Sequence, residues 1–310
     1  MVELLWGLLK TSRPRQWIKN FAVFAALIFS GTLFDRTNQI RSFEAVLLFC
    51  IFSSATYLLN DVFDKERDKL HPFKKKRPVA SGLIPANLAI IVALGLIVIG
   101  LPLAFSLSPA FFFASITYLV LQLLYSTYLK QVILIDVLVI AAGFVLRVYA
   151  GVWAIDAHLN VWFLLSVSSF ALFLAIGKRR SERTLMEGHA GQHRETLLHY
   201  PENLLDILTA MFANSTWLTY ALFTFLQPPI TARGAVNTFL GGFELPFTQA
   251  KFLMATVPVV VYAVMRYLYI IYEKKEGESP ERVILTDAPL LAAVVLWLVM
   301  VTGIIYYLGA

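Results

Sequence analysis

The sequence predicts an all-α integral membrane protein with nine transmembrane helices, and three observations lead to this fold class. First, 58% of the 310 residues are hydrophobic and only 15% are charged, whereas soluble domains carry about a quarter charged residues. Second, nine apolar segments are close to the length of about 20 residues that a helix needs to cross a bilayer. Third, basic residues concentrate in alternate connections between these segments. The single Cys50 excludes an intrachain disulfide.

The nine apolar segments are the expected spans, and together we expect them to form a single domain over residues 1–310. The first is short, and Arg13, Arg15 and Lys19 stand near its start as in a signal peptide. No convincing cleavage site follows, so we interpret it as a helix. The expected spans cover residues 16–34, 43–59, 86–105, 108–129, 132–153, 159–176, 204–226, 252–272 and 288–308.

The distribution of basic residues predicts the orientation in the membrane. One set of segments holds 20 of the 26 Lys and Arg residues when Lys19, near the start of the first span, is counted with the N-terminal segment, and the alternate set holds four. The positive-inside rule places the richer set in the cytoplasm. We therefore expect a multi-pass protein of the cell (inner) membrane with a cytoplasmic N-terminus. The richer set is the N-terminal segment and residues 60–85, 130–131, 177–203 and 273–287.

The densest polar motif lies at the end of the second expected span and reads Asn60-Asp61-Val62-Phe63-Asp64-Lys65-Glu66-Arg67-Asp68. On one helix, Asp61, Asp64 and Asp68 project within an arc of about 60°, and Glu66 points elsewhere. Their mutual repulsion is relieved by a cation, and hard oxygen donors favour Mg²⁺ with substrate phosphates. Asn60 can add a neutral oxygen. A solvated acidic helix end does not explain three acids on one face, so we predict metal–diphosphate binding.

A basic run follows at once and reads His71-Pro72-Phe73-Lys74-Lys75-Lys76-Arg77-Pro78. One interpretation is a membrane anchor that faces anionic lipid. The other is a clamp for phosphate oxygens. Because a metal–diphosphate complex needs cations close to carboxylates, we predict the clamp for Lys74 and Arg77. Lys75 and Lys76 are interpreted as membrane-surface charges.

Other polar residues at the same predicted mouth are weaker candidates. Lys19 either anchors the first span or binds the phosphate of a lipid acceptor. Tyr125 and Lys130 end the fourth span, where Lys130 is a candidate phosphate ligand and Tyr125 a candidate substrate contact or an interfacial tyrosine. Arg147 lies within the fifth span, where a charge is costly and usually has a partner. We interpret Arg147 as part of a structural ion pair or a cavity wall, with Asp136 and Asp156 as candidate partners.

The acidic motif resembles the Asn-Asp-x-x-Asp-x-x-x-Asp motif of the UbiA superfamily of intramembrane prenyltransferases, and the resemblance extends along the whole chain. It implies a UbiA-like bundle of nine helices around a cavity that opens to the cytoplasmic side. It also implies Mg²⁺ as cofactor, a diphosphate at the cavity mouth, and catalytic roles for Asp61, Asp64 and Asp68.

Most of that superfamily carries a second motif, Asp-x-x-x-Asp, after the sixth helix. This chain instead has Gly177-Lys178-Arg179-Arg180-Ser181-Glu182. The replacement is similar to the branch of decaprenyl-phosphate phosphoribosyltransferases. Similar too are three further stretches: Arg13-Pro14-Arg15-Gln16-Trp17-Ile18-Lys19-Asn20, Gly143-Phe144-Val145-Leu146-Arg147, and Arg266-Tyr267 with Ser279-Pro280-Glu281 and Asp287.

The branch implies transfer of 5-phosphoribose from phosphoribosyl diphosphate to a polyprenyl (decaprenyl) phosphate, with release of diphosphate, for cell-envelope glycan precursors. Such a site holds three anionic groups, and Lys178 and Arg179 supply the added positive charge. Glu182 is expected to bind the metal or orient a ribose hydroxyl. The alternative for Lys178 and Glu182 is an exposed ion pair of little energetic weight.

Two other functions stay open from the sequence. A prenyltransferase that moves a prenyl chain from its diphosphate to an aromatic or other acceptor uses the same acidic motif. A transporter fits less well, because charges gather at one mouth and no internal repeat is visible. Expected partners are the polyprenyl phosphate, phosphoribosyl diphosphate and the lipid bilayer, without nucleic acid. A homo-oligomer is left open.

Overall fold

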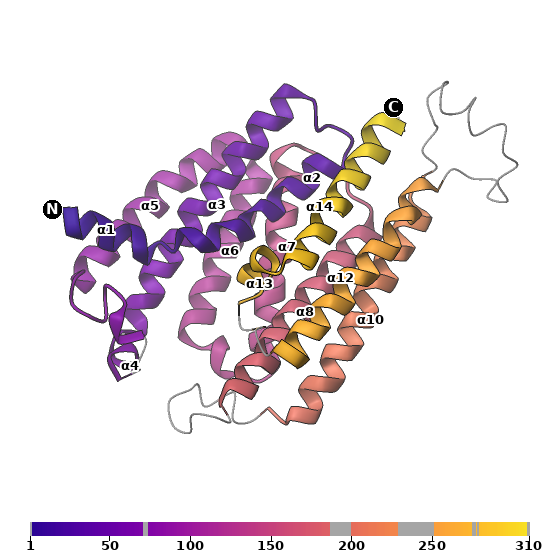
Figure 1. Ribbon diagram of the computed structural model, residues 1–310. Helices are drawn as coiled ribbons and strands as arrows, with labels where there is room; N and C mark the ends of the chain where they lie inside the picture. The colour runs from indigo at the N-terminus through magenta and orange to yellow at the C-terminus, as the bar shows by residue number, and fades with distance from the viewer. Residues whose placement is uncertain are drawn as a thin grey trace, which may run out of the picture. The chain divides into compact units, whose positions relative to one another are not determined.

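The structure is a computed structural model that describes residues 2–70, 74–186, 200–228, 251–274, 277 and 279–308. The described part of the chain is helical and holds no β-strand. It falls into two compact units, the first ending at His158 and the second beginning at Leu159. Figure 1 shows the helices in chain order from indigo to yellow.

The first unit is built around one long helix. α3 packs against α5, α6, α7 and the 3₁₀ helix η1, and Figure 1 shows α3 and α5 side by side. Its elements are α1 (Val2–Thr11), η1 (Pro14–Val23), α2 (Phe24–Phe29), α3 (Arg36–Phe63), α4 (Lys65–Leu70), η2 (Lys74–Lys76), α5 (Ala86–Leu107), α6 (Pro109–Thr127), η3 (Leu129–Gln131) and α7 (Ile135–Ala154).

The second unit has α8 packed along α10, and α12 packed against α10 and α14. Its core gathers Phe173, Ala213, Tyr267, Ile271 and Leu290. Its elements are α8 (Val161–Met186), α10 (Glu202–Leu226), η4 (Phe252–Thr256), α12 (Val257–Tyr269), the π-helical η5 (Ile270–Lys274), α13 (Pro280–Thr286), α14 (Ala288–Gly303) and the π-helical η6 (Ile304–Leu308).

Seven helices of the described residues are long and apolar enough to cross a membrane, so this is a multi-pass membrane protein. They match seven of the nine expected spans. The expected span 204–226 is present as the α-helix α10, but polar residues such as Asn214 and Thr216 lower its hydropathy, and it is not among the seven. The seven are Arg36–Phe63, Ala86–Leu107, Pro109–Thr127, Ile135–Ala154, Val161–Thr184, Phe252–Lys274 and Ala288–Leu308.

The expectation of one continuous α-helix over residues 16–34 is wrong. The chain forms the ten-residue 3₁₀ helix η1 and then the short helix α2. Pro14 opens η1, and Arg13 before it has a left-handed backbone with φ of 51°. Composition predicts burial of this segment but does not distinguish 3₁₀ from α geometry.

The start of α3 is fixed by a local cap, and the helix is unusually long. The Asp35 side chain accepts a hydrogen bond from the Asn38 backbone N–H at 2.8 Å, which satisfies one open donor of the first turn. The helix has 28 residues, or about 42 Å at 1.5 Å per residue, against a hydrocarbon core of about 30 Å. α3, which carries Asn60 and Asp61 in its last turn, is therefore longer than that core is thick.

Candidate active site

The acidic motif spans a helix break. α3 ends at Phe63, Asp64 is the C-cap residue, and α4 begins at Lys65. Helical hydrogen bonds continue across the break, from Asp64 N to Asn60 O at 2.9 Å and from Asp68 N to Asp64 O at 2.8 Å. The spacing that the sequence predicts on one helix is therefore preserved although the helix is not continuous.

Asp61 and Asp68 converge on the same guanidinium nitrogen. Arg77 Nη1 donates to Asp68 Oδ2 at 2.7 Å and to Asp61 Oδ1 at 3.3 Å. Both carboxylates are buried, with residue exposures of 2% for Asp61 and 4% for Asp68. The prediction that these two acids share a face is confirmed.

The connection that carries Arg77 is anchored by its apolar residues. Val79 and Ile84 have no exposed surface and pack in one cluster with Leu58 of α3 and Ala89 of α5. Because burial of such side chains stabilises by about 1.5–3 kcal/mol each, the chain is held against α3. The guanidinium of Arg77 is thereby brought to the acidic motif.

Arg13 also belongs to the site, although the sequence does not predict its contact with the acidic motif. Its Nη2 pairs with Asp61 Oδ1, and its guanidinium carbon lies 4.8 Å from the centroid of the Tyr57 ring. Arg13 and Asp61 are 48 residues apart, so no local pattern links them. The only signal was the basic stretch around Pro14, which also fits a membrane anchor.

Asp64 departs from the expected arrangement. Its Oδ1 accepts from Lys130 Nζ at 2.7 Å and does not share the cation of Asp61 and Asp68. Lys130 lies in η3, directly after α6, and is 5% exposed. Lys130 therefore lies beside the acidic motif, whereas the metal-ligand role predicted for Asp64 together with Asp61 and Asp68 stays a prediction.

The donor set fits a divalent cation through two carboxylates. In the described part of the chain, no group of three His, Cys, Asp or Glu side chains is arranged to hold a metal. Asp61 and Asp68 nevertheless converge on a single positive centre. One or two carboxylates together with substrate phosphates are the usual protein ligands of Mg²⁺. The Asn60 side chain is half-buried next to them on α3.

Glu66 lies within the same motif but differs from the aspartates. It is exposed, and its carboxylate accepts from Lys69 Nζ at 2.8 Å. This hydrogen bond lowers the pKa of Glu66. Glu66 therefore faces solvent, as its helical position predicts, and offers an internal control for the buried acids.

Three other predicted residues are half-buried in the first unit: Lys19 in η1, Lys74 in η2 and Tyr125 near the end of α6. Lys75 and Lys76 are exposed, in line with their interpretation as membrane-surface charges. Residues 71–73 of the basic run lie outside the described residues. The substrate contacts predicted for Lys19, Lys74 and Tyr125 stay predictions.

The basic motif of α8 belongs to the second unit. Arg179 is 2% exposed and pairs with Glu182 Oε2, while Lys178 Nζ lies 3.8 Å from Glu182 Oε1. The three residues thus form one cluster, with Glu182 shared by two cations. The neighbouring Arg180 pairs with a different acid: its Nε donates to Asp206 Oδ1 at 3.0 Å.

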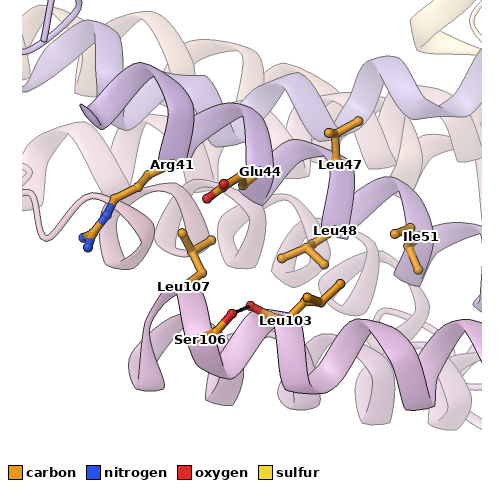
Figure 2. Close-up of a pocket in the computed structure, with 8 residues that line it drawn as sticks. All are labelled: Arg41, Glu44, Leu47, Leu48, Ile51, Leu103, Ser106 and Leu107. Carbon is orange, nitrogen blue, oxygen red and sulfur yellow. Dashed lines mark hydrogen bonds between the residues drawn. The ribbon is translucent and has the colours of Figure 1, made fainter. Parts of the chain in front are cut away.

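One cavity lies away from these residues. It measures about 590 Å³ between the N-terminal half of α3 and the C-terminal end of α5. Figure 2 shows side chains of the two helices facing each other across it. Because the acidic motif lies at the opposite end of α3, this cavity is not the candidate active site. Its lining residues are Arg41, Glu44, Leu47, Leu48, Ile51, Leu103, Ser106 and Leu107.

Comparison with known proteins agrees with the motif. The chain is 32% identical to decaprenyl-phosphate phosphoribosyltransferase of Mycolicibacterium smegmatis, over 98% of this chain and 94% of that protein. It is also 32% identical to the protein of that name from Corynebacterium glutamicum, over 97% of this chain and 87% of that protein. A Mycobacterium tuberculosis relative of the same name is 31% identical, over 96% of this chain and 94% of that protein.

Solved structures show the same fold. A UbiA homologue from Archaeoglobus fulgidus bound to DMAPP and Mg²⁺ superposes with a TM-score of 0.69 at 18% identity, covering 96% of this chain and 98% of that one. The same homologue with GPP and Mg²⁺ gives a TM-score of 0.68 at 19% identity, covering 96% and 99%. The model of the UbiA prenyltransferase family matches residues 20–279. The chain is therefore an enzyme of the UbiA prenyltransferase family.

Proposed function

We propose that this protein transfers 5-phosphoribose from phosphoribosyl diphosphate to a polyprenyl phosphate, releasing diphosphate. The observation that carries the proposal is the site geometry. The buried carboxylates of Asp61 and Asp68 converge on Arg77, Arg13 pairs with Asp61, and Lys130 pairs with the neighbouring Asp64. Near-full-length similarity to decaprenyl-phosphate phosphoribosyltransferases supports the choice of donor and acceptor. The product then serves as a precursor for cell-envelope glycan.

In this proposal Asp61 and Asp68 would hold Mg²⁺, and Asn60 and Asp64 are further candidate ligands. A bound Mg²⁺ supplies charge neutralisation for the leaving diphosphate. Arg13 and Arg77 donate hydrogen bonds to diphosphate oxygens, and guanidinium groups suit this role because their fork matches phosphate geometry. Lys130 and Lys74 add point charges.

The reaction requires positioning more than proton transfer. The C1–O bond of the donor breaks, its electron pair leaves with diphosphate, and an oxygen of the acceptor phosphate bonds to C1. Because that phosphate is already an anion at neutral pH, no general base is needed. Holding the two anions in reach is a large part of catalysis. Lys19 and Tyr125, both half-buried in the first unit, are the proposed contacts for the acceptor.

We propose that Lys178, Arg179 and Glu182 also bind the donor. The donor carries a 5-phosphate that a prenyl diphosphate lacks, and two extra cations suit that charge. We propose one transmembrane domain over residues 1–310 with a cavity open to the cytoplasm, as the resemblance to the UbiA superfamily implies. The family match across residues 20–279 supports this, since it includes both units.

We further propose nine membrane crossings in the cell (inner) membrane, with the N-terminus and site cytoplasmic. The excess of basic residues in alternate connections supports this orientation. The 3₁₀ geometry of η1 also helps a short segment to cross. Ten residues rise about 20 Å at 2.0 Å each, and the six of α2 add about 9 Å at 1.5 Å each.

The direct test is a donor assay with the purified protein in detergent. Mg²⁺, a polyprenyl phosphate and radiolabelled phosphoribosyl diphosphate are supplied, and label is counted in the organic phase. We expect lipid labelling that EDTA abolishes and that Asp64→Ala lowers at least a hundredfold while the protein still elutes as a folded species. Absence of lipid labelling, with diphosphate release from a prenyl diphosphate and an aromatic acceptor, would assign prenyl transfer instead.

A further inference from the structure

Arg147 is a buried cation that the proposed reaction does not use. It lies in α7 and is 5% exposed. Its hydrogen-bond partners in the described part of the chain are neutral: Asn20 Oδ1 at 2.9 Å, Gly143 O at 2.6 Å and Tyr118 Oη at 3.0 Å. The expectation of an ion pair with Asp136 or Asp156 is therefore wrong. A buried charge without a counter-ion is costly. The burial of Arg147 therefore needs an explanation outside the proposed reaction.

Asn20 connects Arg147 to α3. The side chain of Asn20 is fully buried in η1. Its oxygen accepts from Arg147 Nε, and its nitrogen donates to Ser53 Oγ at 3.2 Å and Cys50 Sγ at 3.3 Å. Because guanidinium only donates, Arg147 fixes which end of the amide faces α7. The other end is then directed at α3.

The rest of η1 is held at regular intervals by the same two helices. Trp17 Nε1 donates to Ser54 Oγ on α3 at 3.1 Å. At the other end, the backbone of Val23 packs on Gly151 of α7 so closely that a Cβ there would lie 2.0 Å from the Val23 carbonyl oxygen. Asn20 lies between these two contacts, so Arg147 reaches the centre of η1.

The start of η1 carries Arg13 to the acidic motif. Arg13 has φ of 51°, a conformation that non-glycine residues keep only where the surroundings impose it. It pairs with Asp61 and lies over the Tyr57 ring. A 3₁₀ helix longer than four residues is itself uncommon. Both features therefore depend on contacts that hold η1 in place.

We infer that Arg147 is a positioning residue that acts through Asn20 to fix η1, so that Arg13 stays on Asp61. The inference deepens the proposed function, since Arg13 is a proposed diphosphate ligand. Arg147 itself contacts neither the acidic motif nor any residue proposed to bind substrate.

The test is a double-mutant cycle on donor kinetics. We expect Arg147→Met to lower kcat/KM for phosphoribosyl diphosphate about tenfold, and Arg13→Gln to do the same or more. If Arg147 acts through Arg13, adding Arg147→Met to Arg13→Gln lowers kcat/KM by less than about threefold further. Full additivity overturns the inference. Should Arg147→Met not fold, Arg147→Lys replaces it, because one ammonium cannot hold both Asn20 and Tyr118 in the guanidinium geometry.

A structural readout separates this inference from the proposed function. Backbone amide exchange over residues 14–23 is expected to accelerate in Arg147→Met and to stay as in wild type in Tyr118→Phe. The control removes another partner of Arg147 but leaves its bond to Asn20. Unchanged exchange in Arg147→Met overturns the inference. If the wild-type protein shows no phosphoribosyl transfer, the proposed function fails, and the exchange measurement still decides whether Arg147 holds η1.

Discussion

Asp287 of the second unit and the aspartates of the acidic motif in the first unit both lie at helix ends, but they accept from different kinds of donor. In the second unit, Asp287 accepts from Arg266 at 2.9 and 3.0 Å, from Lys274 at 2.8 Å and from the Leu290 backbone N–H at 3.1 Å. It caps α14 and ties that helix to α12 and η5. In the described part of the first unit, Asp61, Asp64 and Asp68 accept at their carboxylates only from side chains, all of them cationic.

This difference separates a structural carboxylate from a candidate ligand. A backbone N–H at a helix start needs a permanent acceptor, so Asp287 is committed to the fold. A Lys or Arg side chain can move to a phosphate oxygen while the carboxylate turns to a metal. Asp287 and the aspartates of the acidic motif all form ion pairs with Lys or Arg. The additional backbone N–H donor of Asp287 is what distinguishes the structural carboxylate from the candidate ligands.

The largest expected effect is the loss of activity when an aspartate of the acidic motif is replaced. Asp61→Asn keeps the volume of the side chain but removes its charge, and we expect phosphoribosyl transfer to fall at least about a hundredfold. Glu66→Gln, in the same motif but exposed, should leave transfer unchanged. Asp287→Asn should keep most of its transfer per folded molecule. Comparable losses in all three variants would contradict the distinction between the two kinds of carboxylate.

The next effect concerns packing and compares one glycine from each unit. Gly151→Ala places a methyl group against the backbone carbonyl of Val23, which cannot move aside as a side chain can. We expect destabilisation of about 1–3 kcal/mol or more, seen as a lower melting temperature in detergent. Gly303→Ala meets no atom within 4 Å and serves as the control. Equal melting temperatures for the two variants would show that η1 is not packed closely on α7.

A smaller effect tests whether the cluster of Lys178, Arg179 and Glu182 binds the donor. Lys178→Gln is expected to raise KM for phosphoribosyl diphosphate about tenfold with little change in kcat, because it removes a charge-assisted contact. Lys251→Gln removes the same charge near the far end of α10, where Lys251 donates to the Gln227 carbonyl. An unchanged donor KM in Lys178→Gln would return Lys178 to a surface ion pair with Glu182.

The smallest effect is a pH dependence of stability that comes from Asp287. The hydrogen bond from Arg266, with further donors Lys274 and Leu290, holds the pKa of Asp287 well below its ordinary value. A carboxyl whose pKa is depressed on folding stabilises above its unfolded pKa of about 3.9, and this contribution is lost as pH falls further. We expect the melting temperature of wild type to drop by a few degrees more than that of Asp287→Asn between pH 6 and pH 3. If the melting temperatures of wild type and Asp287→Asn fall equally between pH 6 and pH 3, Asp287 does not contribute to the loss of stability in acid.

Much of the fold and part of the site follow from sequence alone. Seven of the nine expected spans coincide with helices long and apolar enough to cross a membrane, because hydropathy over some 20 residues is a local property. The shared face of Asp61 and Asp68 follows from their helical spacing of seven residues. The cluster of Lys178, Arg179 and Glu182 is likewise confined to one helix. In each case the partners are close in the chain and the helix repeat fixes their relation.

The remaining contacts depend on which segments pack together. Arg13 meets Asp61 across 48 residues, Lys130 meets Asp64 across 66, and Arg147 meets Asn20 across 127. Composition and spacing do not predict such distant pairs. They point to Asp136 and Asp156 as partners of Arg147, and neither is its partner in the structure. The 3₁₀ form of η1 belongs to the same class, since it is held by Gly151 of α7 and by Ser53 and Ser54 of α3. Local chemistry determines where helices form and which acids share a face; long-range packing determines which cation each acid meets.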